Sequence, residues 1–206
     1  MTAVLIISAA VSYLSGGING AIILSRLVYH DDIRKYGSNN PGFTNFKRVY
    51  GNNAVSWSVI LIDALKTVLP VLATAIVMNA LYGQWQLGAQ FSGLFCMIGH
   101  CFPVWYGFKG GKAFITGFAT IWFVDWRMTL IAMAVFFALL FTLKYMSVAS
   151  CCAAAVCPVA LAFLGVSDVW VEILAIAAAA LVICRHYPNF IKLARGTESK
   201  FTLRGK

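Results

Sequence analysis

The strongest chemical signal in the sequence is a glycine-rich segment, residues 99–112, which reads GHCFPVWYGFKGGK. Lys109 and Lys112 stand on either side of Gly110 and Gly111, and the segment runs directly into an apolar stretch. Glycines let a backbone turn its N–H groups toward a ligand, and lysines add positive charge. A helix that starts after such a loop directs its dipole at an anion. The segment is therefore a candidate phosphate-binding loop. The alternative is a flexible turn with snorkelling lysines, which would explain the lysines but not so many glycines beside them.

This segment is not the P-loop of nucleotide-binding proteins. If Lys112 were the P-loop lysine, the pattern would need glycine at position 106 and serine or threonine at 113. The sequence has Tyr106 and Ala113 instead. The sequence therefore gives no support to ATP hydrolysis.

A second polar segment, residues 37–48, reads GSNNPGFTNFKR. Its glycines, proline and asparagines favour tight turns. Short hydrogen-bonding side chains and an arginine make it a candidate ligand-binding loop, and the alternative is a solvated turn between two helices. The candidate residues are Ser38, Asn40, Thr44, Asn45 and Arg48.

A third segment, residues 185–200, reads RHYPNFIKLARGTESK. Taken alone, it is typical of a basic stretch that lies on anionic lipid. His186 and Asn189 would share a face if the preceding helix continued, although Pro188 opposes continuity. Glu198 lies further along the same segment.

Three ionisable residues lie in or beside apolar runs. Asp63 and Lys66 are three positions apart, so on a helix they could neutralise each other. We interpret them as a structural pair, with a direct role toward substrate as the alternative. We interpret His100 as a hydrogen-bonded structural residue, with a catalytic role as the alternative. The six cysteines have no spacing typical of a metal site or a disulfide framework.

The elements that must position these residues are membrane helices. Apolar residues make up 61% of the 206 residues and charged residues only 11%, far from the balance of a soluble domain. The formal net charge of +9 fits the bias of basic residues toward cytoplasmic loops and headgroups, and it does not favour nucleic-acid binding. The sequence predicts an all-α integral membrane protein.

Seven apolar runs are expected to cross the membrane, and together they form one multi-pass domain over residues 1–206. The fourth run is short, because Ala113–Val124 would rise only ~18 Å as a helix, and it must borrow residues from its flanking loops. The predicted spans are 3–25, 53–78, 89–108, 112–126, 128–144, 147–166 and 169–185.

Alternate connections carry the positive charge. Residues 26–50, the lysine pair at 109 and 112, Lys144 and the tail fall on one side of the membrane. The positive-inside rule places that side in the cytoplasm. The N-terminus is then expected outside and the C-terminus inside, with all three polar segments at the cytoplasmic face.

Taken in order, the three segments resemble the bacterial acyl-phosphate:glycerol-3-phosphate acyltransferase family. The family patterns are close to GSGNPGATNxxR, GHxFPVxxGFKGGKG and RHxxNIxRLxxGxExK. The family's Asp and Lys-Gly correspond to Asp63 and Lys66-Thr67, and its Tyr-x-Ser to Tyr145 and Ser147. The sequence departs from the family at a few positions, where it has Asn39, Phe43, Thr67 and Ala113.

The resemblance implies transfer of a fatty acyl group from acyl phosphate to the 1-hydroxyl of glycerol 3-phosphate. The product would be lysophosphatidic acid, in the first step of phospholipid biosynthesis at the bacterial inner membrane. An acyl phosphate is already activated, so positioning and charge stabilisation could suffice without a covalent enzyme intermediate. No metal, cofactor or protein partner is implied beyond the two substrates and membrane lipid.

The resemblance also implies roles for individual residues. The lysine-glycine loop would bind glycerol phosphate and the first polar segment acyl phosphate. His186 and Asn189 would orient or deprotonate the hydroxyl, unless a substrate phosphate oxygen takes the proton. The expected catalytic residues are Ser38, Arg48, His186 and Asn189. The expected substrate-binding residues are Asn40, Thr44, Asn45, Lys109, Gly110, Gly111 and Lys112. Structural or accessory roles are expected for Asp63, Lys66, His100, Tyr145, Ser147 and Glu198.

Two other classes of protein remain as alternatives. A small transporter would have polar sites near mid-membrane, often in repeated halves, whereas here no repeat is evident and the polar clusters lie on one side. A phospholipid-binding membrane protein without catalytic activity could use the same loops.

Overall fold

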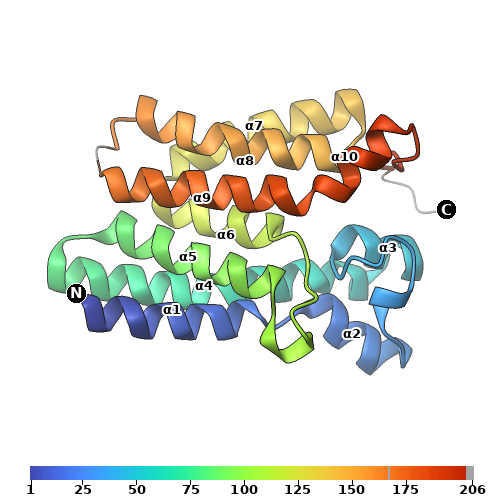
Figure 1. Cartoon of the computed structure of the whole chain (residues 1–206), viewed down its shortest axis with the longest axis horizontal. Coiled ribbons are helices and arrows are strands. Elements are labelled where there is room, and N and C mark those ends of the chain that lie inside the picture. The colour runs from blue at the N-terminus through green and yellow to red at the C-terminus, as the bar shows by residue number, and fades with distance from the viewer. Residues whose placement is uncertain (167, 203–206) are drawn as a thin grey trace.

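The computed structural model describes residues 1–166 and 168–202, which fold into the helical bundle of Figure 1. Two short turns, η1 (Ile33–Lys35) and η2 (Val104–Tyr106), lie in loops. The described residues contain no strand, so the all-α prediction is confirmed. The helices are α1 (Thr2–Gly16), α2 (Gly20–Tyr29), α3 (Phe43–Tyr50), α4 (Ala54–Tyr82), α5 (Trp85–Cys101), α6 (Phe114–Val124), α7 (Trp126–Leu143), α8 (Met146–Phe163), α9 (Val169–Arg185) and α10 (Tyr187–Ala194).

Five segments of the described chain are long and apolar enough to cross a membrane. They are α1 with α2, α4, α5 with η2, α7, and α8. The pair α9 and α10, bent by 47°, would make a sixth, and α6 is a shorter apolar helix of 11 residues. A helix therefore lies in each of the seven predicted ranges, while the count of seven crossings and the orientation of the termini stay predictions.

Some helix boundaries differ from the predicted ones. The range 3–25 is not one continuous helix, because α1 ends at Gly16 and α2 begins at Gly20. Between them Asn19 has an extended backbone, and its side-chain oxygen accepts a hydrogen bond from the Ile22 amide at 2.9 Å. Such an N-cap stabilises a new helix start. The glycines around the single Asn19, in the run GGING at residues 16–20, carried the signal for this break.

The turn after α4 is also shorter than predicted. Helix α4 runs to Tyr82 and α5 begins at Trp85, where the sequence predicts spans that end at 78 and begin at 89. Uncharged polar side chains here continue the helix, and Gly83, with a left-handed φ of +66°, ends it. At its other end α5 stops at Cys101 and not at 108, because Pro103 restricts the residue before it.

Figure 1 shows α7, α8 and α9 along one side of the bundle, with α1, α4 and α5 along the other and α6 between. Helix α1 packs closely on α5: an added Cβ at Gly16 would lie 2.2 Å from the carbonyl oxygen of Cys96. Ser12 hydrogen-bonds Ser92 at 2.7 Å across the same contact. Close approach at small residues is a common way to pack membrane helices.

The three polar segments gather at one end of the bundle. Figure 1 shows α3, the loop before α6, and α10 at the same end. The chain after α10 crosses this end, where the Phe201 amide donates to the carbonyl of Lys144 at 2.6 Å. The Lys47 ammonium donates to the carbonyl of Thr202 at 3.3 Å. The predicted meeting of the polar segments is thus present in the structure.

Candidate active site

The main chain of the glycine-lysine loop folds back on the end of α5. The amides of Gly110 and Gly111 donate to the carbonyls of Cys101 and His100, at 3.2 and 3.0 Å. The Arg185 guanidinium donates to the carbonyls of both glycines, each at 3.0 Å. Both amides therefore have partners within the protein, and the two glycines shape the loop. A direct role of Gly110 and Gly111 in binding phosphate stays a prediction.

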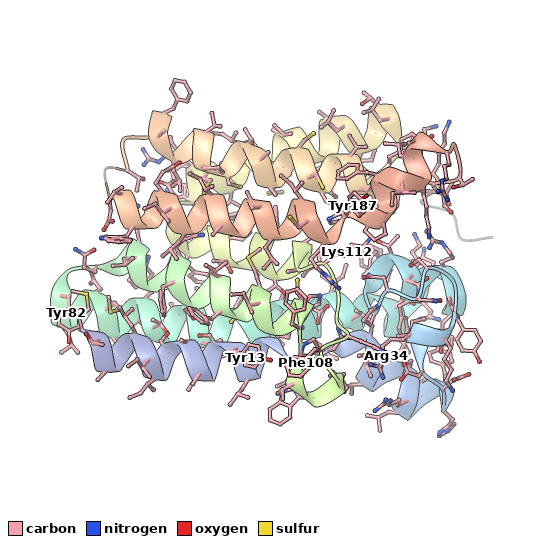
Figure 2. The ribbon with its side chains drawn as sticks, viewed as in Figure 1. Tyr13, Arg34, Tyr82, Phe108, Lys112 and Tyr187 are labelled. Carbon is pink, nitrogen blue, oxygen red and sulfur yellow. The ribbon has the colours of Figure 1, made fainter. Side chains whose placement is uncertain are left out.

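The side chain of Lys112 extends from this loop and is hydrogen-bonded in a chain of polar side chains. Its ammonium donates to the side-chain oxygen of Asn189, whose amide nitrogen donates to Glu198 at 2.8 Å. The other carboxylate oxygen of Glu198 is buried without a hydrogen-bond partner among the described residues. Figure 2 shows Lys112 between the α9–α10 junction and α3. The loop, α10 and the tail thus contribute to one polar site.

The charge on Lys112 depends on its surroundings. Lys112 lies in the loop before α6, outside the helix. Burial lowers the pKa of its ammonium to about 8, and the nearby Lys192 acts in the same direction. The Glu198 carboxylate opposes both effects. Lys112 therefore carries its charge at neutral pH and begins to lose it at mildly alkaline pH.

His186 occupies the bend between α9 and α10, next to Lys112. Its ring nitrogen Nδ1 is 2.8 Å from the carbonyl oxygen of Val182, so Nδ1 carries a proton and donates. Burial, with the Lys112 ammonium nearby, lowers the pKa of His186 to about 4. The ring is then neutral at pH 7, and its Nε2 offers a lone pair. This nitrogen can accept a hydrogen bond from a hydroxyl group.

Asn189 reaches this site although the helix does not continue through His186. Helix α9 ends at Arg185 and α10 starts at Tyr187, with Pro188 in its first turn. The main-chain N–H of Asn189 donates to the main-chain carbonyl of His186 at 2.8 Å, and this turn links the two residues. The predicted effect of Pro188 on helix continuity is thus present as a bend.

The first polar segment contains one residue with a clear scaffolding role. Asn45 is 1% exposed; its side-chain oxygen accepts from the Ser38 amide at 2.8 Å, and its nitrogen donates to the Tyr36 carbonyl at 3.0 Å. These bonds use the side chain to fix the loop before α3. The expectation that Asn45 contacts substrate has no support in this geometry.

Other residues of this segment are open to a ligand. The side chains of Ser38, Thr44 and Arg48 make no hydrogen bond to residues 1–166 or 168–202, and Arg48 is exposed. Thr44 and Arg48 are four positions apart on α3 and share a face. Asn40 lies in the preceding turn, where its carbonyl accepts from the Gly42 amide at 3.0 Å. The side chains of Ser38, Thr44 and Arg48 are therefore available to bind a ligand.

The departures from the resembled patterns have local explanations. Asn39 and Ala113, which stand where those patterns have glycine, adopt left-handed φ values of +60° and +57°. Asparagine tolerates this conformation better than most residues, whereas alanine is strained there. Phe43 packs on Trp57 with ring centres 4.9 Å apart, and Thr67 bonds the carbonyl of Asp63 within α4 at 2.9 Å.

The accessory residues divide into two groups. Asp63 and Lys66 form the expected ion pair at 2.7 Å, and His100 lies beside them, with Nδ1 2.8 Å from the lysine ammonium. Tyr145 precedes α8, and Ser147 in its first turn is 2% exposed with a hydroxyl that has no partner in the described residues. The first group lies behind the glycine-lysine loop.

An apolar cavity lies inside the bundle, between α5, α6, α7, α8 and α9. It extends to Val182, whose carbonyl binds His186. Val182 therefore links the wall of this cavity to His186. Other lining residues are Met97, Phe114, Met128, Cys157 and Ala175.

A sequence model described as "Glycerol-3-phosphate acyltransferase" matches residues 6–196. The chain belongs to the glycerol-3-phosphate acyltransferase family. Family members include proteins of that name from Mesorhizobium japonicum, 35% identical over all of both chains, and from Methylorubrum populi, 39% identical over 98% of this chain and 95% of that one.

Two solved structures of family members are also similar. Both are crystal structures of PlsY, described as an integral membrane glycerol 3-phosphate acyltransferase. The glycerol 3-phosphate form has a TM-score of 0.86 and 30% identity, covering 96% of each chain. The lysophosphatidic acid form has a TM-score of 0.82 and 29% identity, covering 96% of this chain and 95% of the other. The fold and the membrane class of this chain are therefore those of the family.

The sequence analysis missed two residues that position the loops of the candidate site. Arg185 holds both glycine carbonyls, and its place beside His186 in the third segment was the available signal. Asn19 donates from its side chain to the carbonyl of Pro41 at 3.1 Å and so ties the first polar segment to the α1–α2 break. A lone asparagine in an apolar run was the only sign of this role.

Proposed function

We propose that this chain transfers a fatty acyl group from acyl phosphate to the 1-hydroxyl of glycerol 3-phosphate. The products are 1-acyl-glycerol 3-phosphate and inorganic phosphate. Membership of the glycerol-3-phosphate acyltransferase family supports this reaction class. The observation that carries the proposal is that the buried cation Lys112 lies near His186, whose ring binds the carbonyl of Val182, a residue that lines an apolar cavity. One substrate needs the cation, and the other needs both a cation and an apolar cavity.

The acceptor phosphate binds at Lys112 and Lys109. Lys112 is directed into the site by the loop, while Lys109 is exposed at its edge. Gly110 and Gly111 contribute through the shape of the loop, since their amides are already bonded. Asn189 and Glu198 supply further polar atoms for the glycerol hydroxyls.

The donor phosphate binds at Ser38, Thr44 and Arg48, whose side chains are open to a ligand. Asn40 and Asn45 support that site as parts of the loop before α3. The apolar cavity has a free volume of about 40 Å³, so it takes only a small part of the acyl chain, and the rest of the chain extends between the helices into the lipid. Burial of each methylene is worth ~0.8 kcal/mol.

The transfer step needs no covalent enzyme intermediate. The 1-hydroxyl oxygen attacks the carbonyl carbon of the acyl phosphate, the carbon–oxygen bond to phosphate breaks, and phosphate leaves with the electron pair. The hydroxyl proton passes to Nε2 of His186 or to a phosphate oxygen. Arg48 and Ser38 offset charge that develops on the departing phosphate.

We place the reaction at the cytoplasmic face of the bacterial inner membrane. The basic loops of this chain and its polar residues lie at one end of the bundle, which supports that placement. Membrane lipid surrounds the bundle, and the substrates are the only partners that the proposal requires.

The decisive experiment uses purified protein, palmitoyl phosphate and labelled glycerol 3-phosphate. Formation of labelled lysophosphatidate that depends on palmitoyl phosphate supports the proposal. Absence of product overturns it. In proteoliposomes, uptake of glycerol 3-phosphate without acylation would point to a transporter, and lipid binding with neither activity would point to a phospholipid-binding protein.

A further inference from the structure

A buried lysine joins several elements behind the candidate active site. The ammonium of Lys66, on α4, lies 2.5 Å from the carbonyl oxygen of Ile18, in the α1–α2 break. It also lies 2.7 Å from Asp63 and 2.8 Å from Nδ1 of His100, at the end of α5. The side chains of all three ionisable residues are at most 5% exposed. The three ammonium hydrogens of Lys66 therefore have three buried acceptors.

This arrangement fixes the ring of His100. An ammonium group can only donate, so Nδ1 of His100 accepts and the proton of the neutral ring sits on Nε2. The ring cannot turn over without leaving a buried ammonium hydrogen unpaired, which is costly. Lys66 thereby determines both the tautomer and the orientation of His100.

The fixed ring lies directly against the glycine-lysine loop. An added Cβ at Gly111 would lie 2.1 Å from Nε2 of His100, and its three nearest atoms would all belong to that ring. At Gly110 the added Cβ would instead lie 2.0 Å from the main-chain oxygen of His100. Gly111 thus packs on a side chain, and Gly110 packs on backbone.

We propose that His100 is a positioning residue for Lys112. Its imidazole, held at Nδ1 by Lys66, supports Gly111 and sets the direction in which Lys112 leaves the loop. The requirement for glycine at position 111 then comes from the imidazole, and not from close approach of a phosphate to the backbone. This inference rests on the proposed function, because it takes Lys112 to bind the acceptor phosphate.

The test is a steric exchange between the two residues. Gly111→Ala should raise the KM for glycerol 3-phosphate about tenfold or more and leave the KM for acyl phosphate nearly unchanged. In the double variant His100→Asn with Gly111→Ala, the asparagine oxygen can still accept from Lys66 while the shorter side chain leaves room for the methyl group. The double variant should recover most of the lost affinity.

Gly110→Ala is the matched control. Its clash is with the main-chain oxygen of residue 100, which stays in place when the side chain is shortened. Adding His100→Asn to Gly110→Ala should therefore rescue nothing. Equal rescue of both alanine variants, or additive effects of His100→Asn and Gly111→Ala, would overturn the inference.

Thermal unfolding of the same purified variants separates this inference from the proposed function. Rescue of Gly111→Ala by His100→Asn should also appear in Tm, which needs no activity. A wild-type protein that makes no lysophosphatidate refutes the proposed function, whatever the unfolding data. An active wild type whose variants fail to couple in KM and Tm refutes the role of His100 alone.

Discussion

Lys112 and Asn189, 77 positions apart in the chain, are joined by a hydrogen bond from the ammonium group to the side-chain amide oxygen. Because that oxygen accepts, the nitrogen of Asn189 is directed at Glu198, to which it donates at 2.8 Å. A loop, a helix and the tail are thereby fixed relative to one another at a single side chain. Asn189 holds the cation in place before any substrate arrives.

Removal of this cation should weaken binding of one substrate more than the other. We expect Lys112→Ala to raise the KM for glycerol 3-phosphate roughly ten- to a hundredfold, since a charge-assisted hydrogen bond contributes ~1.5–3 kcal/mol. The KM for acyl phosphate should change much less. Steady-state kinetics with each substrate varied in turn measures the difference. A larger effect on acyl phosphate would mean that the two phosphate sites are exchanged.

The pH dependence of acceptor binding should follow the protonation of Lys112. The pKa of this group is about 8, so its charge is lost as pH rises through that value, and the KM for glycerol 3-phosphate should then increase. Glu198→Gln should move this increase to lower pH and Lys192→Gln to higher pH, because the two groups shift the pKa in opposite directions. Shifts in the same direction would refute the assignment to Lys112.

Arg48→Lys should impair the reaction severely. A guanidinium binds phosphate through a planar fork, and a flexible ammonium cannot replace both hydrogen bonds. We expect kcat/KM to fall roughly ten- to a hundredfold. Arg127→Lys is the control, because Arg127 pairs with Asp125 at 2.7 Å between α6 and α7, away from the polar segments. Turnover near the wild-type value in Arg48→Lys would mean that Arg48 only contributes positive charge to the cytoplasmic side and does not bind phosphate.

Ala113 offers a test of backbone strain. Its φ of +57° costs an alanine ~1–2 kcal/mol, but its buried methyl group contributes ~0.8 kcal/mol in return. Ala113→Gly should therefore change the free energy of unfolding by less than about 1 kcal/mol. Ala113→Val should destabilise by about 2 kcal/mol or more, through strain and overpacking. Thermal unfolding in detergent compares the two, and a well-tolerated valine would contradict the expected strain.

The predicted topology can be tested by labelling. Gln84 and Asp168 line the same polar depression, so they should share one side of the membrane. Single cysteines there should react with an impermeant reagent on whole cells, whereas cysteines at Lys47, Lys109 and Lys200 should not. The background must lack native thiols, of which Cys152 and Cys184 are exposed. External labelling at Lys47 or Lys200 would overturn the seven-span prediction.

Much of the fold could be predicted because its signals are local. Apolar runs predicted the helices, and the glycines and prolines of the polar segments predicted the turns. The Asp63–Lys66 pair followed from helical spacing alone. The gathering of the three segments at one end followed from the alternation of the helices.

The details of the site depend on contacts between distant residues. The amides of Gly110 and Gly111 turn inward onto the end of α5, and Arg185 binds the two carbonyls from about 75 positions along the chain. Asn45 was predicted to bind substrate, because a side-chain amide can hydrogen-bond either a substrate or the main chain of its own loop. In the structure it bonds the loop. Sequence pattern alone cannot distinguish these uses, since both need the same donors and acceptors.

The brevity of α6 has a consequence for how the two reactants meet. Eleven residues give a helix ~16 Å long, about half the ~30 Å thickness of a bilayer's hydrocarbon core. The loop that carries Lys112 can therefore descend to the depth at which the acyl chain of a lipid begins. The water-soluble acceptor and the proposed membrane-dissolved acyl donor could then meet at the same depth and react there. On this basis, membranes of different thickness should alter the rate of the enzyme even where its amino acids are unchanged.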